Sequence, residues 1–280
     1  MDMAEARSPE VRPVRDRLPK PTPFGELVRD SRQARRLSQL ELSLQADISA
    51  RHLSYIENGR SKPSREMVGR LADVLDLSLR DRNQLLLAAG FAPTHGETNL
   101  AAPQMGPARA AIDLILAHQE PYPALVMDRG WNVLLTNQAA QRFMRLMGLG
   151  RSTQRNVIRL IMDPAELRPR IVNWEAAAGD LVRQLQRQAA TAPPDDPTHR
   201  LLDEVMAYPG VPDAWRTHEF RAAAEPLMSV LYENNGVALS FFTTITCFAA
   251  PHDITLEELR VECSFPGDAE TAARCRALLT

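Results

Sequence analysis

Cysteine, long apolar runs and targeting signals are scarce or missing in this 280-residue chain, and each absence excludes a class of protein. The three cysteines, Cys247, Cys263 and Cys275, show no C-x-x-C spacing, so we expect neither structural zinc nor disulfides. The longest apolar stretch, 237–250, is interrupted by serine and threonine and falls short of the ~20 apolar residues of a membrane span. The N-terminus lacks the apolar core of a signal peptide. We therefore expect a cytoplasmic protein without membrane insertion.

Catalytic motifs are missing as well. No G-x-S-x-G, H-E-x-x-H or phosphate-binding loop occurs, and His199, His218 and His252 are scattered along the chain. We therefore expect no enzyme and no bound cofactor.

The composition is that of a globular protein, with 44% hydrophobic and 24% charged residues, and the length suits two ordinary domains. The net charge is −2, yet the segment 20–70 carries ten Lys and Arg against six Asp and Glu. A local basic excess in an acidic protein suits a module that contacts phosphates on one face.

Four segments follow from proline, glycine and apolar periodicity. Residues 1–22 carry many charges and four prolines without a periodic pattern, which predicts a flexible tail. Residues 23–92 predict an all-α domain of five short helices. Residues 93–108 are rich in proline and glycine and predict a linker, and residues 109–280 predict an α+β domain.

Helix boundaries in the all-α domain follow from capping residues. The first helix is expected to end near Leu37. Ser38 and Glu41 form an S-x-x-E capping box for the second, and Ser49 is placed to cap a third that stops at Asn58-Gly59. The fourth opens at Pro63-Ser64, and the fifth runs from a second box at Ser78 and Asp81 to Gly90.

One stretch of the second helix carries a conflicting signal. Leu40, Leu42 and Leu44 alternate at period two, which favours a strand. The capping box just before them favours a helix, and a helix is what we predict.

The segment 37–64, LSQLELSLQADISARHLSYIENGRSKPS, has the helix, tight turn and second helix that a DNA major-groove reader needs. It resembles the Xre-type helix-turn-helix family, which includes phage repressors. The resemblance rests on Ser38-Gln39, on Asp47-Ile48-Ser49, and on Ile56-Glu57-Asn58-Gly59-Arg60 leading to Pro63-Ser64. Ser43 departs from the family, which usually has a small alanine there. The resemblance implies a sequence-specific transcriptional regulator that binds double-stranded DNA, and such readers usually act as homodimers.

Roles carry over position by position. Gln39 would hold a phosphate or brace the first recognition side chain, and Ser49 would cap the recognition helix. Arg51 is the best candidate base reader, because arginine can pair with both acceptors of a guanine. Arg60 and Lys62 would contact phosphates. Other groove-facing candidates are Ala50, His52 and Tyr55, although packing or solvent exposure stays open for His52 and Tyr55.

The second domain opens with a pattern typical of PAS-type sensors. A strand at 125–127, an Asp128-Arg129-Gly130 turn and a strand at 131–136 predict a hairpin, followed by a helix at 137–147 that starts with Asn-x-Ala-Ala. We also predict helices at 109–119 and 174–190 and strands at 238–248 and 259–265. Together with the segments 80–90, 170–174 and 240–259, the chain resembles the MmyB-like transcription regulators. Those join an Xre-type domain to a PAS-like ligand-binding domain, and some accommodate a fatty acid.

The resemblance implies a small apolar ligand in the second domain. An apolar cavity lined by Trp131, Met144, Phe241, Phe242, Ile245 and Phe248 would hold it, although the same side chains could form solid core. A carboxylate on the ligand would need a cation, and Arg170 beside Asn173 is the candidate, with a surface ion pair as its alternative role. Two further alternatives stay open: a domain that binds a protein partner or only dimerises, and haem binding.

Overall fold

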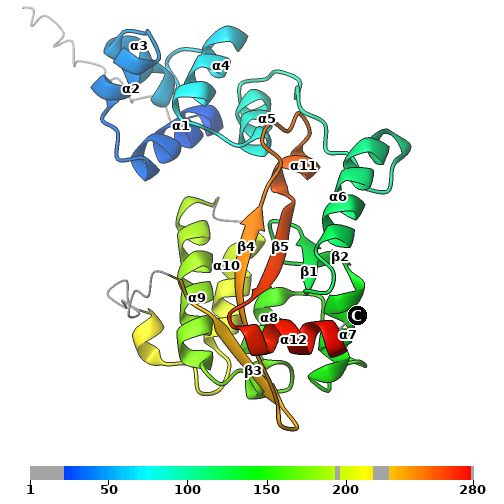
Figure 1. Ribbon diagram of the computed structural model, residues 1–280. Coiled ribbons are helices and arrows are strands. Elements are labelled where there is room, and N and C mark those ends of the chain that lie inside the picture. Colours follow the sequence, from blue (N-terminus) through cyan, green and yellow to red (C-terminus); the bar gives the residue numbers. More distant parts are fainter. Residues whose placement is uncertain (1–21, 193–195, 217–226, 279–280) are drawn as a thin grey trace, which may run out of the picture. The chain divides into compact units, whose positions relative to one another are not determined.

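A computed structural model describes residues 22–192, 196–216 and 227–278 (Figure 1). The chain divides into two compact units, the first with the residues up to Leu77 and Asp81–Pro93, the second with Ser78–Arg80 and the residues from Thr94 onward. The predicted flexible tail, residues 1–22, lies outside the described residues except for Thr22, as does His218. Among the helices described, none has both the length and the apolar character for crossing a membrane.

The first unit contains the five predicted short helices, except that the first two residues of the fifth, Leu79 and Arg80, belong to the second unit. They are α1 (Pro23–Ala34), α2 (Gln39–Gln45), α3 (Ala50–Glu57), α4 (Arg65–Val74) and α5 (Leu79–Ala88). The capping box before α2 is confirmed, since Ser38 Oγ accepts from Glu41 N and the Glu41 carboxylate accepts from Ser38 N. Ser49 caps α3 and Ser64 caps α4 with a single bond each, the two hydroxyls accepting from His52 N and Met67 N. The first helix ends earlier than expected, because Arg36 has a left-handed φ of 57°, at which a helix cannot continue.

The conflicting leucines of α2 are helical. Leu42 is fully buried, whereas Leu40 and Leu44 are 59% and 71% exposed. Residues two apart lie on different faces of a helix, so the alternation placed one leucine in the core and left its neighbours outside. The prediction of a helix is therefore confirmed.

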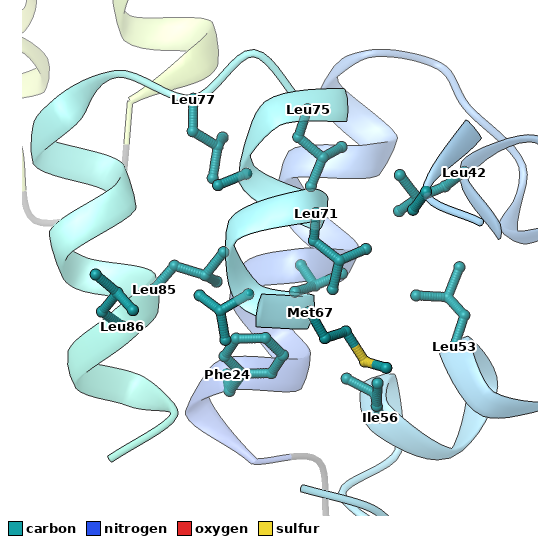
Figure 2. Packing of buried hydrophobic residues seen from close by; sticks show 14 residues of the cluster. Phe24, Leu42, Leu53, Ile56, Met67, Leu71, Leu75, Leu77, Leu85 and Leu86 are labelled. Atoms are coloured by element: carbon teal, nitrogen blue, oxygen red, sulfur yellow. The ribbon is translucent and has the colours of Figure 1, made fainter. Parts of the chain in front are cut away.

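The core of the first unit forms around α4 (Figure 2). Met67, Leu71 and Leu75 follow one face of this helix, and Leu53 and Ile56 of α3 approach them from one side in the view. The remaining labelled side chains are Phe24, Leu42, Leu77, Leu85 and Leu86. All are buried, so every helix of the unit contributes to a single core.

The second unit is an α+β domain around one antiparallel sheet of five strands in the order β2-β1-β5-β4-β3. The strands are β1 (Ala124–Met127), β2 (Val133–Thr136), β3 (Val230–Asn234), β4 (Val237–Thr246) and β5 (Arg260–Pro266). The helices are η1 (Pro103–Met105), α6 (Gly106–His118), α7 (Gln138–Leu146), α8 (Val157–Met162), η2 (Arg168–Arg170), α9 (Trp174–Thr191), α10 (Pro197–Met206), η3 (Asp213–Arg216), α11 (Ile254–Glu258) and α12 (Ala269–Leu278). The predicted α+β fold is confirmed, although η1 and the start of α6 occupy the end of the predicted linker.

The two faces of β5 have different surroundings. Val261 and Cys263 are buried in one cluster with Ile112 and Leu116 of α6. Glu262 lies between them in the sequence and therefore points to the opposite face, because side chains alternate along a strand. All three cysteines, Cys247, Cys263 and Cys275, carry free thiols.

A glycine sets the spacing of α1 and α3. A Cβ atom at Gly25 would lie 2.6 Å from the carbonyl oxygen of Glu57 and 2.7 Å from that of Ile56. Both distances are shorter than van der Waals contact, and both oxygens belong to the backbone of α3. Only glycine therefore permits the observed approach of the two helices.

Gly25→Ala is expected to lower the free energy of unfolding of the first unit by roughly 1–3 kcal/mol, because α1 and α3 must separate. Gly69→Ala in α4 is the matched control. Nothing lies within 4 Å of its added Cβ, so the helix should gain about 0.5–1 kcal/mol. Hydrogen exchange of α1 and α3 amides in the full chain measures both effects, and equal protection in the two variants would contradict the close packing.

Candidate DNA interface and ligand cavity

The turn between α2 and α3 is short and closed by backbone contacts. Asp47 takes a left-handed φ of 52°, and the N–H of Ile48 donates to Ser43 O at 3.0 Å. Ser43 itself is buried, and its hydroxyl donates to Leu40 O at 2.8 Å. The serine that departs from the family pattern thus satisfies its own hydroxyl within α2, and the turn is formed as the motif predicts.

A buried carboxylate holds α3 against its neighbours. Glu57, the last residue of α3, is 0% exposed and accepts two hydrogen bonds from Arg32 of α1, at 2.8 Å from Nε and 3.2 Å from Nη2. Gln39 Nε2 of α2 donates to the same carboxylate at 2.7 Å. Arg29 reaches the carbonyl oxygen of Glu57 at 3.2 Å and the Asn58 side chain at 3.1 Å. One side chain therefore joins α1, α2 and α3.

Gln39 has a structural contact that the sequence did not indicate, because its amide nitrogen braces the end of α3 through Glu57. Its expected contact with a phosphate or with the first recognition side chain stays a prediction. Arg29 and Arg32 also satisfy carbonyl and carboxylate groups at the C-terminus of α3, where positive charge complements the helix dipole.

The outer face of α3 carries the predicted base reader. Arg51 is exposed, and its Nε donates to the Tyr55 hydroxyl at 2.9 Å, with the guanidinium carbon 5.3 Å from the centre of the Tyr55 ring. The two side chains are one turn apart and hold each other in place. Tyr55 therefore supports Arg51 in the free protein.

The remaining predicted DNA-binding residues surround this pair. Ser49 accepts from His52 N at 3.1 Å as the N-cap, and Ala50 begins the helix half-buried. His52 is half-buried, and its Nε2 is enclosed with no hydrogen-bond partner among the described residues. Arg60 and Lys62 are exposed in the segment between α3 and α4. The eight predicted residues thus belong to α2, to the turn that ends at Ser49, to α3 and to the segment that follows.

The second unit contains a cavity of about 670 Å³. Its walls come from β1, β2, β3 and β5 of the sheet, from α7 and α8, and from the segment between these two helices. Most lining residues are apolar, among them Leu125, Val133, Leu135, Phe143, Met144, Leu149, Val157, Leu160 and Ile161. An apolar cavity of this size is typical of a small-molecule site.

Four titratable side chains line the cavity. Arg145 and Arg155 are exposed, whereas Tyr232 and Glu262 are partly buried. Burial raises the pKa of Glu262 to about 7. Burial also raises the pKa of Tyr232, and the nearby charge of Glu262 adds to that shift. The two groups therefore share one poorly hydrated environment.

A buried asparagine positions α7 over the sheet. Asn137 Oδ1 accepts from Ala140 N at 2.9 Å as the N-cap of α7 and from Ala124 N of β1 at 3.0 Å. Its Nδ2 donates to Tyr122 O at 2.8 Å. Ala139 and Ala140 are buried behind it. The Asn-x-Ala-Ala pattern therefore brings Phe143 and Met144 to the cavity wall.

The aromatic residues predicted to line the cavity do not do so. Phe241 and Phe242 are adjacent in β4, and side chains alternate along a strand, so they point to opposite faces. Phe241 is buried edge-on against Phe143, with ring centres 6.0 Å apart, and so lies behind the wall. Phe242 stacks on Phe265, and Phe248 packs on the cluster that contains Ile112 and Leu116.

Trp131, Arg170 and Asn173 do not line the cavity either. Trp131 is 1% exposed in a core formed with α8, α9 and α10, and its Nε1 donates to Gln188. Arg170 lines a separate hollow of about 350 Å³. Asn173 bonds the backbone of Ser229 and Leu231, which fastens β3 to the start of α9. Ile245, also named for the wall, is 40% exposed and is not among the cavity-lining residues, so Met144 alone of this predicted set lines the cavity.

Sequence reasoning missed Glu262 and Tyr232. A charged residue between Val261 and Cys263 is a signal of a strand with two different faces. Which face encloses a cavity depends on the pairing of β5 with β1, where Leu125 lies opposite Glu262, and no local pattern encodes that pairing.

The two sites have matching counterparts among known proteins. Residues 28–81 match a family model described as helix-turn-helix, and residues 108–278 match the model of the MmyB-like transcription regulator ligand binding domain. A helix-turn-helix joined to a ligand-binding domain defines the class of DNA-binding transcription regulators. Because the second match covers more than half of the chain, the chain belongs to the MmyB-like transcription regulators.

Two individual proteins are also similar to parts of the chain. The ImmF control region 10 kDa protein of Bacillus phage phi105 is 38% identical over 56 residues, which are 20% of this chain and 62% of that protein. The chain thus spans less than two thirds of that relative. An RNA-binding Light-Oxygen-Voltage receptor matches with a TM-score of 0.23 and 14% identity over 91% of this chain and 61% of that one. A TM-score this low does not indicate a shared fold.

Glu57→Gln is expected to destabilise the first unit by roughly 3–5 kcal/mol, because Arg32 would keep a buried charge without its counter-charge. The exposed Glu66 of α4 offers a control, and Glu66→Gln should change stability by less than about 0.5 kcal/mol. Hydrogen exchange over residues 50–58 of the full chain measures the difference. Similar protection in both variants would rule out the proposed role of Glu57 in holding α3 against α1 and α2.

Proposed function

We propose that this regulator binds specific operator sequences with α3 in the major groove and that its activity responds to a small apolar ligand in the second unit. DNA reading is assigned to residues 23–92 and ligand sensing to residues 109–280. The observation that most supports this proposal is the buried hydrogen-bond network of Glu57 in the same helix as the exposed Arg51. It gives a base-reading side chain a rigid support, and rigid support is what specific readout requires. The proposed role is regulation, not catalysis.

Arg51 is proposed to read a guanine. It is the exposed arginine of α3, and its contacts are to the hydroxyl and ring of Tyr55, which base edges can replace. Gln39, Ser49, Ala50, His52 and Tyr55 are proposed to lie at the same interface, while Arg60 and Lys62 contact phosphates. The regulator would bind near-palindromic operators as a homodimer, with half-sites about one helical turn apart.

The ligand is proposed to occupy the cavity between the sheet, α7 and α8. Its volume of about 670 Å³ falls within the usual range for small-molecule sites, and its lining combines a majority of apolar residues with several polar ones. A fatty acid, which the family resemblance implies, would find cationic partners in Arg145 and Arg155 instead of Arg170, which lines another hollow.

Arg51→Ala is expected to weaken specific operator binding by roughly 1–3 kcal/mol and to leave most non-specific binding intact, because a base contact is lost. Lys62→Ala should weaken both modes alike and reduce the slope of binding against salt by about one. Arg82→Ala is the control, since Arg82 pairs with Asp73 of α4 and lies outside the proposed interface. Equal loss of specific and non-specific binding in Arg51→Ala would reassign Arg51 to phosphate.

Met144→Trp is expected to fill part of the cavity and abolish co-purification of a hydrophobic ligand, which mass spectrometry of an organic extract detects. Leu114→Trp on the exposed surface of α6 should leave the ligand in place. A protein captured by residues 109–280 without any extracted ligand would favour the alternative in which this domain binds a protein partner.

A further inference from the structure

The cavity is lined by charged side chains of both signs, two arginines and one glutamate. Arg145 and Arg155 are exposed, where water and salt screen their charge. Glu262 is more enclosed, on the sheet wall, and there its carboxylate interacts more strongly with whatever occupies the cavity. The enclosed group should therefore have the greater influence on ligand choice.

Glu262 has no partner of its own. Among the described residues, no hydrogen bond or ion pair reaches its carboxylate, and burial is the cause of its raised pKa. The residues opposite it on the neighbouring strands are Leu125 of β1 and Ile245 of β4, neither of which can donate from its side chain. Tyr232 is near enough for the charge of Glu262 to raise its pKa, but no hydrogen bond joins the two side chains. Glu57, the buried carboxylate of the first unit, accepts several hydrogen bonds by contrast. Glu262 is an acceptor left open toward the cavity.

An open acceptor in an apolar wall discriminates among ligands. A partly desolvated carboxylate without a donor is costly, and a ligand that supplies a donor removes that cost. Above the pKa of about 7 that burial gives Glu262, its carboxylate is ionised. A protonated amine then gains a charge-assisted hydrogen bond, an alcohol gains a neutral one, and a carboxylate meets a like charge.

We infer that the cavity takes an amphiphile whose apolar body fills the space beside α7 and α8 and whose amino group binds Glu262. The inference rests on the proposed function of the cavity as a ligand site and narrows its ligand class. A fatty acid is then a poor ligand unless its carboxylate stays at the exposed arginines.

Three probes of one chain length test this on the full-length protein: decylamine, 1-decanol and decanoate, each below its micellar concentration. Displacement of the apolar fluorophore N-phenyl-1-naphthylamine measures binding. Decylamine is expected to bind at least about tenfold more tightly than decanoate, with 1-decanol between them. Glu262→Gln should reduce that preference to about twofold or less, whereas Ser264→Ala, on the same cavity wall, should leave it unchanged.

The outcomes separate this inference from the proposed function. Decanoate binding as tightly as decylamine to the wild-type protein would overturn the inference while leaving the cavity as a ligand site, and this comparison does not depend on any variant folding. A preference that persists in a folded Glu262→Gln protein would overturn it as well. Failure of all three probes to displace the fluorophore, or no effect of Met144→Trp on binding of the fluorophore, would remove the ligand site itself and the inference with it.

Discussion

A carboxylate that is out of contact with water determines the geometry of the first unit. Glu57 ends the recognition helix, and its charge is compatible with burial because Arg32 and Gln39 donate to it from two other helices. Removing any of these partners leaves a polar group unsatisfied, so alternative packings of α3 are disfavoured. Buried ion pairs add little net stability compared with apolar packing, and their better-supported contribution is to select one arrangement. Here that arrangement leaves Arg51 exposed on a helix that is joined to α1 and α2.

The same network changes how the basic charge of the segment 20–70 is interpreted. Arg29 and Arg32 contribute to the local positive excess, yet both are engaged at the C-terminus of α3. The charge available to a polyanion comes instead from exposed side chains such as Arg51, Arg60 and Lys62. A charge count along the chain therefore overstates the electrostatic attraction that the folded unit offers to DNA.

In the second unit, asparagine side chains join helices to strands and turns in a comparable way. Asn137 joins α7 to β1, Asn156 joins α8 to the turn at Gly130, and Asn173 joins α9 to β3. Each bonds backbone groups that a helix or strand end leaves unpaired. Because α7 and α8 form walls of the cavity, these amides also determine its shape. Glu262 is the contrasting case, a polar group on the sheet wall of the cavity that no described residue satisfies.

Local signals in the sequence were sufficient for the helices of the first unit, because caps such as Ser38 and Ser49 act within one turn of the chain. They were also sufficient for the helix-turn-helix motif and for the α+β class of the second unit. The cavity wall was mostly mispredicted, since an apolar residue such as Trp131 or Phe241 carries no local sign of whether it faces core or cavity. Strand pairing and helix placement join residues far apart in the sequence. Only the tertiary structure decided that Gln39 meets Glu57 and that Glu262 faces the cavity, because both contacts depend on that long-range packing.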